Sequence, residues 1–578
     1  MEFPESQSTS GRPANSSAIE IEPGLKRMIL IELIFPMVLL ILGIYHGLMQ
    51  VLYRSGMIHT RKVFGLEYFQ GLTLHGVVNA IVFTTFFAVA FGYAVIRFYL
   101  GRALNLKVAW LSFALMVIGT LLAAGAILSG KASVLYTFYP PLRAHPAFYI
   151  GLTLVVVGSW IAFFNWFPPY FAWKREHPGE KMPLAVVGIF AAFIVWLIAT
   201  IPVAIEILFL LLPWSMGWVP TVNVPLARML FWFFGHPLVY FWLLPTYVMY
   251  YTMLPQLAGG KLFSDFAGRL TFLWLVLYSA PVGIHHQFTE PGISSTWKFV
   301  HAFFTMLVAV PSFATAFALA ASMEHGARAS GGRGLMGWWT KLPYLDRDRW
   351  LFSYFFCGLV IFIFGGVTGI INASYNLDVV VHNTSWLPAH FHQTVAGPIF
   401  LSYIGMSLFL VAKLGGKEIR LPGWNVWVPY IWTLGIMIFS TGLFIGGAGG
   451  EPRRTNMGLT YTNPQSPLYH ADWQIAKTLG SIGGTIMALA ALIFFIVFFA
   501  TLLSRSAKKG GLEVIVSQPY HDEHVPAVQS FTPWLAGAAL LLIIAYAPPI
   551  AQTLRSNFPG AKPFTPDNPV PVSMAPKP

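Results

Sequence analysis

Long runs of apolar residues, separated by short polar segments, follow one another along almost the whole chain. Each run has about 20 to 30 residues, the length that a helix needs to cross a hydrocarbon layer of roughly 30 Å. The pattern therefore predicts an all-α fold, a polytopic membrane bundle of about thirteen transmembrane helices. The expected spans are 28–53, 70–96, 108–130, 147–171, 184–213, 225–255, 269–288, 300–325, 350–374, 386–412, 424–447, 474–504 and 530–551.

The composition agrees with this class, because 56% of the 578 residues are hydrophobic and 10% are charged, against about 25% charged in a soluble domain. A soluble enzyme and a disordered protein are thereby excluded. The single cysteine, Cys357, lies in an apolar run and allows neither a disulfide framework nor a cysteine-based metal site. Any metal must be bound by histidine or carboxylate. The net charge of +13 is explained by the loops of a membrane protein and indicates no nucleic-acid partner.

Positive charge is divided unequally between the two sides of the predicted bundle. Of the 35 Lys and Arg residues, 22 fall on the side of the N-terminus and 13 on the other. Because cytoplasmic loops collect Lys and Arg, the bias predicts a cytoplasmic N-terminus and, with an odd number of spans, an outer-face C-terminus. We expect residues 1–25 to form a polar cytoplasmic segment, 26–555 a single transmembrane domain, and 556–578 a Pro-rich external tail.

Several histidines lie inside apolar runs, where an ionisable side chain costs on the order of 2.5 to 3.5 kcal/mol and therefore indicates a functional site. His236 and Tyr240 are four residues apart in the sixth span, on one helical face. The adjacent His285 and His286 end the seventh span. Three imidazoles from two helices are a plausible trigonal site for copper, iron or zinc.

A second group of histidines suits haem iron, for which imidazole is a common axial ligand. His390 and His392 open the tenth span, and residues two apart on a helix point about 200° around from each other. One helix could therefore ligate two different irons. His75 in the second span is a candidate sixth ligand. With the predicted orientation, these three histidines and the first three all lie in the outer part of the membrane.

The motifs that contain these histidines resemble subunit I of a haem-copper oxygen reductase, and the B-family cytochrome c oxidases in particular. The matching segments are Gly235-His-Pro-Leu-Val-Tyr240, Val282-Gly-Ile-His-His-Gln287 and Asn383-Thr-Ser-Trp-Leu-Pro-Ala-His-Phe-His392. The resemblance implies that Tyr240 is a catalytic residue, joined covalently to His236 and able to supply an electron and a proton. The ligand sets that it implies are His236, His285 and His286 for one copper ion (copper B), His390 for the high-spin haem, and His75 with His392 for the low-spin haem.

Polar residues on the predicted outer side resemble the family's partners of the haem propionates. Arg453 and Arg454 follow the eleventh span, and paired guanidiniums suit carboxylates. Asp378 and His382 precede the tenth span and match residues beside a propionate of the high-spin haem.

A polar stripe leads from the predicted metal site towards the cytoplasm and resembles the family's proton path. Tyr247 and Tyr251 lie seven and eleven residues after Tyr240, and Ser312 and Thr315 are one turn apart on the eighth span. The position three residues after Thr315, where the resemblance leads us to expect another hydroxyl, is Ala318. Either a water replaces that hydroxyl or the path bends.

The resemblance implies the catalytic subunit of a terminal respiratory oxidase that reduces O₂ to water with coupled proton uptake or pumping. It also implies a low-spin haem of b type, a high-spin haem of a type, a subunit II with a dicopper electron-entry site, and a c-type cytochrome or similar donor. A quinol donor and small additional membrane subunits remain possible. The expected location is the plasma membrane of a bacterium or archaeon.

Two other classes of membrane protein also use histidines inside membrane helices. A nitric oxide reductase uses the same histidine frame with a non-haem iron in place of copper, but Tyr240 argues against it because two-electron chemistry does not require the phenol. A proton-coupled secondary transporter would use scattered histidines, often near the midplane, whereas these histidines cluster towards one face.

Overall fold

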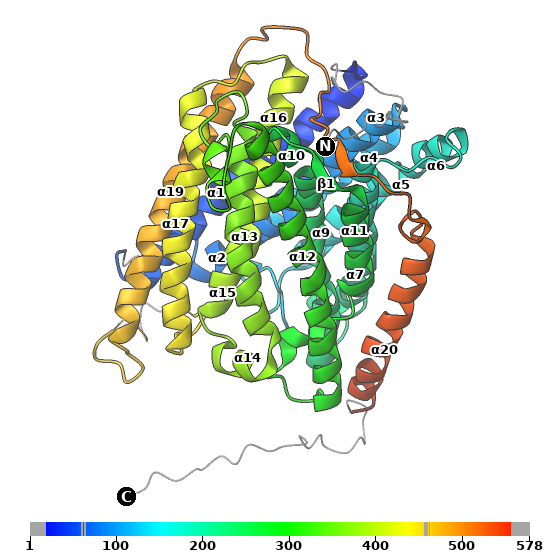
Figure 1. Ribbon diagram of the computed structural model, residues 1–578. Coiled ribbons are helices and arrows are strands. Elements are labelled where there is room, and N and C mark those ends of the chain that lie inside the picture. The colour runs from blue at the N-terminus through cyan, green and yellow to red at the C-terminus, as the bar shows by residue number, and fades with distance from the viewer. Residues whose placement is uncertain (1–18, 59–61, 63–64, 456–460, 462, 557–578) are drawn as a thin grey trace, which may run out of the picture.

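A computed structural model describes residues 19–58, 62, 65–455, 461 and 463–556, which form a bundle of long helices that run in roughly the same direction (Figure 1). Within this described part, twelve helical segments are long and apolar enough to cross a membrane. They are α1 (Pro23–Arg54), α2 to α3 (Tyr68–Leu100), α4 (Leu106–Leu128), α5 with α6 (Pro146–Glu176), α7 to α8 (Leu184–Ser215), α9 (Val224–Thr252), α12 (Ser295–Ala329), α13 (Leu351–Ala373), α15 to α16 (Trp386–Gly415), α17 (Pro422–Ala448), α19 (Asp472–Leu503) and α20 (Thr532–Ser556). The polytopic all-α fold is thereby confirmed.

Shorter elements connect the long helices. The helical ones are α10 (Leu254–Leu257), α11 (Asp265–Tyr278), η3 (Gly283–Gln287), η4 (Trp338–Lys341), α14 (Tyr375–Val381) and η6 (Pro526–Val528). Two three-residue strands, β1 (Leu262–Ser264) and β2 (Pro519–His521), pair in parallel and tie the start of α11 to the segment before α20.

The predicted helix over 269–288 differs from the structure, so the described chain has twelve membrane-length helices rather than thirteen. Here α11 has 14 residues and ends at Tyr278, and the histidine pair lies on the separate 3₁₀ turn η3. Pro281 explains the break, because it has no N–H for a helical hydrogen bond and disfavours the helical conformation in the residue before it. The apolar run continues through this break, and for this reason the hydropathy pattern predicts one continuous helix.

Three of the long helices contain a π-helical stretch, in which the hydrogen bonds span five residues and the register of the following side chains is shifted. These stretches are η1 (Val77–Phe83), η2 (Glu206–Leu211) and η5 (His392–Ile399). Two of the three lie at predicted haem ligands, since η1 begins two residues after His75 and η5 begins at His392.

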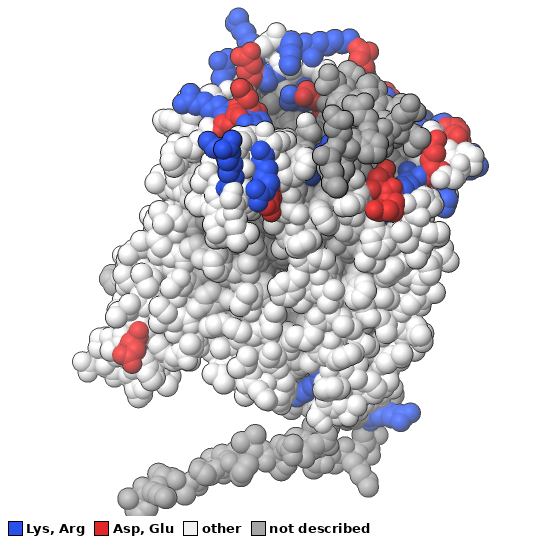
Figure 2. Space-filling model, in the orientation of Figure 1, with Lys and Arg blue, Asp and Glu red and all other residues white. Residues whose placement is uncertain are grey.

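Charged side chains are concentrated at the end of the bundle where α1 begins (Figure 2). We call this the charged end; it includes the ion pairs Glu22 with Arg97 and Lys181 with Asp522. The predicted membrane orientation and the boundaries of the transmembrane domain stay predictions. Of the two predicted terminal segments, residues 1–18 and 557–578 lie outside the described residues.

Close helix packing in the bundle relies on glycine, as at the contact between α4 and α5. A Cβ added to Gly119 would lie 2.5 Å from the carbonyl oxygen of Gly151, and one added to Gly151 would lie 2.5 Å from that of Gly119. Because these are backbone atoms, no side chain can move to make room. Small residues that let helix backbones approach are typical of membrane bundles.

We predict that Gly119→Ala destabilises the protein by about 1 to 3 kcal/mol, the usual cost of overpacking. The matched control is Gly125→Ala on the same helix, because a Cβ there would have no neighbour within 4 Å. The measurement is the temperature of half-inactivation of the detergent-solubilised protein. Equal temperatures for the two variants would show that the α4–α5 contact does not depend on Gly119.

Candidate functional site

Three imidazoles converge where η3 packs against α9. His236 comes from α9, and His285 and His286 come from η3. One ring nitrogen from each lies within 4.8 Å of those of the other two, and His236 Nδ1 is 3.1 Å from His286 Nε2. In the described part of the chain, this is the one group of three or more such side chains close enough to hold a metal, and it contains no carboxylate. The structure thus brings together the three histidines that the sequence analysis grouped as one metal site.

Neighbouring side chains fix the orientation of the η3 imidazoles. The Thr305 hydroxyl donates to the carbonyl of His301 at 2.6 Å, so it accepts a hydrogen bond from His285 Nδ1 at 2.9 Å. His285 therefore carries its proton on Nδ1 and leaves Nε2 free to bind a metal. His286 stacks on Trp232, with ring centroids 3.8 Å apart. Gly283 permits this contact, because a Cβ there would collide with the Trp232 carbonyl.

Tyr240 lies one turn of α9 beyond His236, as the spacing predicted. The two rings are 5.0 Å apart between centroids and inclined at 61°. Within the described part of the chain, His236 Nε2 is buried and has no hydrogen-bond partner.

A second pair of imidazoles, His75 of α2 and His392 at the start of η5, lie nearly parallel with ring centroids 6.2 Å apart. His75 Nδ1 donates to the carbonyl of Gly43 at 2.8 Å, and His392 Nδ1 donates to that of Pro388 at 2.6 Å. Each ring therefore keeps Nε2 for a metal. A metal–nitrogen bond is about 2 Å and a ring centre lies about 1 Å beyond its nitrogen, so the observed spacing fits one iron between the rings.

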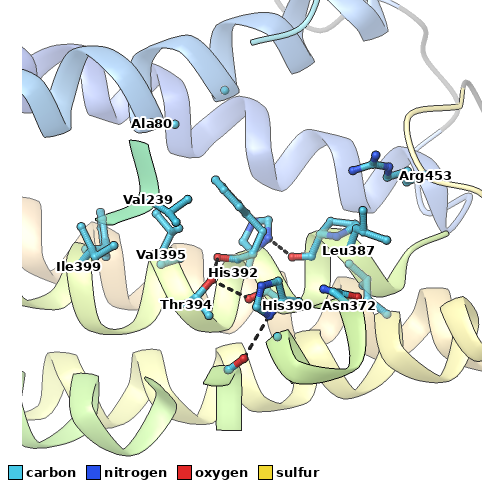
Figure 3. Close-up of a pocket in the computed structure, with 18 of the residues that line it drawn as sticks. Ala80, Val239, Asn372, Leu387, His390, His392, Thr394, Val395, Ile399 and Arg453 are labelled. Carbon is cyan, nitrogen blue, oxygen red and sulfur yellow. Dashed lines mark hydrogen bonds between the residues drawn. The ribbon is translucent and has the colours of Figure 1, made fainter. Parts of the chain in front are cut away.

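His390 belongs to the same helical segment as His392 but contacts α13 instead (Figure 3). Its Nδ1 lies 3.1 Å from the carbonyl oxygen of Gly365 and 3.0 Å from the hydroxyl of Thr368. The close approach requires Gly369, because a Cβ there would lie 2.9 Å from the imidazole. His390 thus contacts α13, whereas His392 faces His75 of α2, as the separation of 200° predicted.

One cavity of about 610 Å³ connects these groups. The residues predicted as ligands, as the redox tyrosine and as propionate partners all line it: His75, His236, Tyr240, His285, His286, Asp378, His382, His390, His392, Arg453 and Arg454. Most of the lining is apolar, which suits two haem macrocycles.

Guanidinium groups at one rim of this cavity suit the binding of anions. Burial and the neighbouring Arg454 lower the pKa of Arg453 to about 9, and within the described residues its Nε has no hydrogen-bond partner. The Asp378 carboxylate is already bound by His382 Nδ1 at 2.8 Å. A guanidinium with a buried, unused Nε–H donor fits a carboxylate such as a haem propionate.

Sequence reasoning missed further charged residues at this rim. Arg54 at the end of α1 donates to Glu451 at 2.7 Å, and Lys477 of α19 lines the same cavity. Arg54 and Glu451 are 397 positions apart in the chain, so no local pattern could have paired them.

The residues of the predicted polar stripe form two hydroxyl pairs between α9 and α12. Tyr247 donates to Ser312 at 3.2 Å, and the Tyr251 and Thr315 hydroxyls lie 2.8 Å apart. Ala318 is buried. The Tyr251 hydroxyl also lies 3.1 Å from that of Thr271 on α11, a contact that sequence reasoning missed.

A membrane bundle with three clustered imidazoles and a separate parallel imidazole pair on one cavity has the arrangement expected of a haem-copper oxygen reductase. Comparison with known proteins agrees. The family model described as cytochrome c and quinol oxidase polypeptide I matches residues 27–486, and the chain belongs to this family.

Individual relatives support the same assignment. Cytochrome c oxidase subunit 1 of Thermus thermophilus is 42% identical over 502 residues, which cover 84% of this chain and 86% of the relative. A probable quinol oxidase subunit 1 of Staphylococcus epidermidis is 27% identical over 459 residues, or 74% of this chain and 62% of that protein. A solved structure of a haem-copper terminal oxidase dimer has a TM-score of 0.92 and 48% identity and covers 95% of this chain and 96% of its own.

The recognition drawn from the histidine motifs is therefore confirmed. The chain is the catalytic subunit of a terminal oxidase that reduces O₂, a multi-pass membrane oxidoreductase of the respiratory chain. Haems, copper, a subunit II partner and an electron donor follow from the family. Neither the nitric oxide reductase nor the transporter alternative is favoured.

We predict that Thr305→Val lowers the affinity of the three-histidine group for its metal by about 10- to 100-fold, the usual effect of removing a hydrogen bond that orients a metal ligand. Valine keeps the shape of threonine but cannot accept the hydrogen bond from His285 Nδ1. Copper per chain is measured as a function of chelator concentration. Thr153→Val, at a partly buried threonine of α5 far along the chain from the site, is the control. Indistinguishable copper retention in the two variants would mean that Thr305 does not orient the ligand.

Proposed function

We propose specific roles for the residues that line the central cavity. His236, His285 and His286 hold copper B, His390 is the axial ligand of a high-spin haem of a type, and His75 and His392 hold a low-spin haem of b type. Arg453, Arg454, Asp378 and His382 bind or surround the propionates. When bound, these groups supply electron transfer and the site at which O₂ is reduced.

The observation that carries this proposal is the common arrangement of the imidazoles. In His75, His285, His390 and His392, Nδ1 is bonded to an oxygen of the protein, so the proton is held there and Nε2 remains a metal ligand. All four line one cavity together with His236 and His286. Separate structural histidines would have no reason to share both features.

His236 uses its nitrogens differently. Its Nδ1 faces His286 within the metal group, whereas Nε2 is buried and, among the described residues, has no hydrogen-bond partner. We assign that free nitrogen to a covalent bond with a ring carbon of Tyr240. Forming this bond removes one hydrogen from the imidazole nitrogen and one from the ring carbon, a two-electron oxidation for which O₂, the substrate of the enzyme, is the oxidant. With copper and haem bound, the modified phenol would supply one electron and one proton to the reduction of O₂, so that four electrons would be available in a single step.

Protons reach Tyr240 along α9 and α12 from the charged end, which we assign to the cytoplasm because Lys and Arg gather there. Tyr251 and Tyr247 each contact a hydroxyl of α12, at Thr315 and Ser312 respectively. The eleven residues from Tyr251 to Tyr240 correspond to a rise of about 16 Å. This orientation puts the metal site towards the outer face of a bacterial or archaeal plasma membrane.

Electrons enter from partner proteins. We propose a subunit II with a dicopper site, supplied by a c-type cytochrome or a similar redox protein. The name of the Thermus relative favours a cytochrome donor over a quinol. Small additional membrane subunits could complete the complex.

The metal content of the purified complex tests the ligand assignment. After subtraction of the metals of partner subunits, we expect two irons and one copper per chain. Three irons without copper would contradict copper B and indicate a non-haem iron.

We predict that His75→Leu removes the low-spin haem absorption and one iron per chain while copper is retained, because His75 is proposed as an axial ligand of that haem alone. Optical spectra and metal analysis provide the measurement. Selective loss of the high-spin haem instead would show that the pairing of histidines with haems is wrong.

We predict that Tyr240→Phe keeps both haems and copper but lowers O₂ consumption by about 100-fold or more, because the phenol hydroxyl and its electron are lost. Tyr139→Phe, which removes a buried phenol outside the proposed redox and proton-path residues, is the control. Substantial steady-state turnover by Tyr240→Phe would contradict the proposed role.

A further inference from the structure

The hydroxyl of Tyr251 has two hydroxyl neighbours on two different helices. Thr315 of α12 lies at 2.8 Å and Thr271 of α11 at 3.1 Å. All three side chains are buried, with exposed fractions of 2% or less. Thr315 belongs to the stripe proposed above, whereas Thr271 does not, and its contact with Tyr251 needs its own explanation.

The directions in which these hydroxyls donate can be assigned from their partners. Thr315 donates to the carbonyl of Pro311 at 2.7 Å, so it must accept from Tyr251. Tyr251 has then used its one proton and must accept from Thr271. Among the described residues, Tyr251 is the one hydrogen-bond partner of the Thr271 hydroxyl. The three O–H groups therefore point in one sense, from α11 through Tyr251 to α12.

On α12 itself, the route from Thr315 towards the charged end is interrupted. The positions one turn further are Ala318 and Leu319, both apolar and buried. The next hydroxyl, that of Ser322, donates to the carbonyl of Ala318 at 2.7 Å and accepts from the amide of Phe263 at 2.9 Å. Ser322 is seven positions from Thr315, a rise of about 10 Å, so the two hydroxyls cannot contact each other directly.

The other helix next to Tyr251 leads to polar residues at the charged end. From Thr271, α11 runs back to its first residue, Asp265, six positions away and a rise of about 9 Å. The Asp265 carboxylate binds Arg269 at 2.6 Å and lies 3.9 Å from Lys181. Lys181 in turn binds Asp522, whose side chain is 60% exposed. A series of ion pairs from Asp265 through Lys181 to Asp522 thus reaches the surface.

We propose that Thr271 is a proton-path residue that carries the path around Ala318 by connecting α11 to Tyr251. This inference rests on the proposed proton path through Tyr251. In the transfer, Thr271 gives its hydroxyl proton to the Tyr251 oxygen as Tyr251 gives its own to Thr315. Thr315 turns from the Pro311 carbonyl and passes its own proton on to Tyr247, and a water on the side of the charged end resupplies Thr271. Each hydroxyl thus loses one proton and gains one, and no electron moves.

The test uses the purified complex with its partner subunits. O₂ consumption is measured with ascorbate and tetramethyl-p-phenylenediamine as reductant, and proton uptake is followed with a pH indicator after the reduced complex is mixed with O₂. We expect Thr271→Val to lower turnover and proton uptake by about tenfold or more, since a positioned proton-transfer group contributes 10²–10⁴-fold. The haem spectra and the copper content stay unchanged.

Three further variants separate a proton path from packing. Thr271→Ser keeps the hydroxyl and should retain at least about half of the turnover, a loss within the effect of a small cavity. Ala318→Thr in the Thr271→Val background should restore turnover by returning a hydroxyl to α12. Thr120→Val on α4, which is equally buried, should behave like the unmodified complex.

The outcomes distinguish this inference from the function on which it rests. Normal turnover of Thr271→Val together with impaired Tyr251→Phe would overturn the role of Thr271 and leave the path through Tyr251 intact. Normal turnover of both variants would overturn the path itself and Thr271 with it. Equal losses in Thr271→Val and Thr271→Ser, or loss of haem absorption in Thr271→Val without rescue by Ala318→Thr, would assign Thr271 to packing.

Discussion

The site depends on one repeated interaction, the hydrogen bond from Nδ1 of a buried imidazole to an oxygen of the protein. In an apolar interior an unpaired N–H is costly, and a charged imidazolium is more costly still. Bonding Nδ1 to a fixed oxygen satisfies the N–H, selects one tautomer and directs Nε2 into the cavity. The imidazoles held in this way are His75, His285, His390 and His392.

Backbone geometry determines where those oxygens are available. A Cβ on Gly47 would lie 2.6 Å from the His75 ring, and one on Gly369 would lie 2.9 Å from the His390 ring, so α1 and α13 can reach the imidazoles because these positions lack side chains. The π-helical stretches η1 and η5 follow the same ligands and reset the register of the helix beyond them. The positions of these imidazoles therefore depend on how closely the neighbouring helices pack.

The sequence alone was sufficient for the features that depend on residue type and spacing. An imidazole in an apolar run is costly enough to be informative, and the offsets from His236 to Tyr240 and from His390 to His392 determine which sides of a helix they occupy. Features that depend on a second helix could not be predicted in this way. In the sequence, Thr305 and Thr271 do not differ from other threonines of membrane helices. Their contacts with His285 and Tyr251 are formed only when the helices pack.

The positive charge at the rim of the cavity beside Arg453 indicates how bound anions and the fold would stabilise each other. Arg453 lies half-buried beside Arg454, and desolvation together with that neighbour holds its pKa near 9. The Asp378 carboxylate acts against this shift, but one carboxylate cannot balance two guanidiniums. An uncompensated buried charge costs several kcal/mol, so the rim is more stable with further carboxylates in it. In the proposed assignment the haem propionates are anions of this kind, and their binding would stabilise Arg453 and Arg454 in these positions.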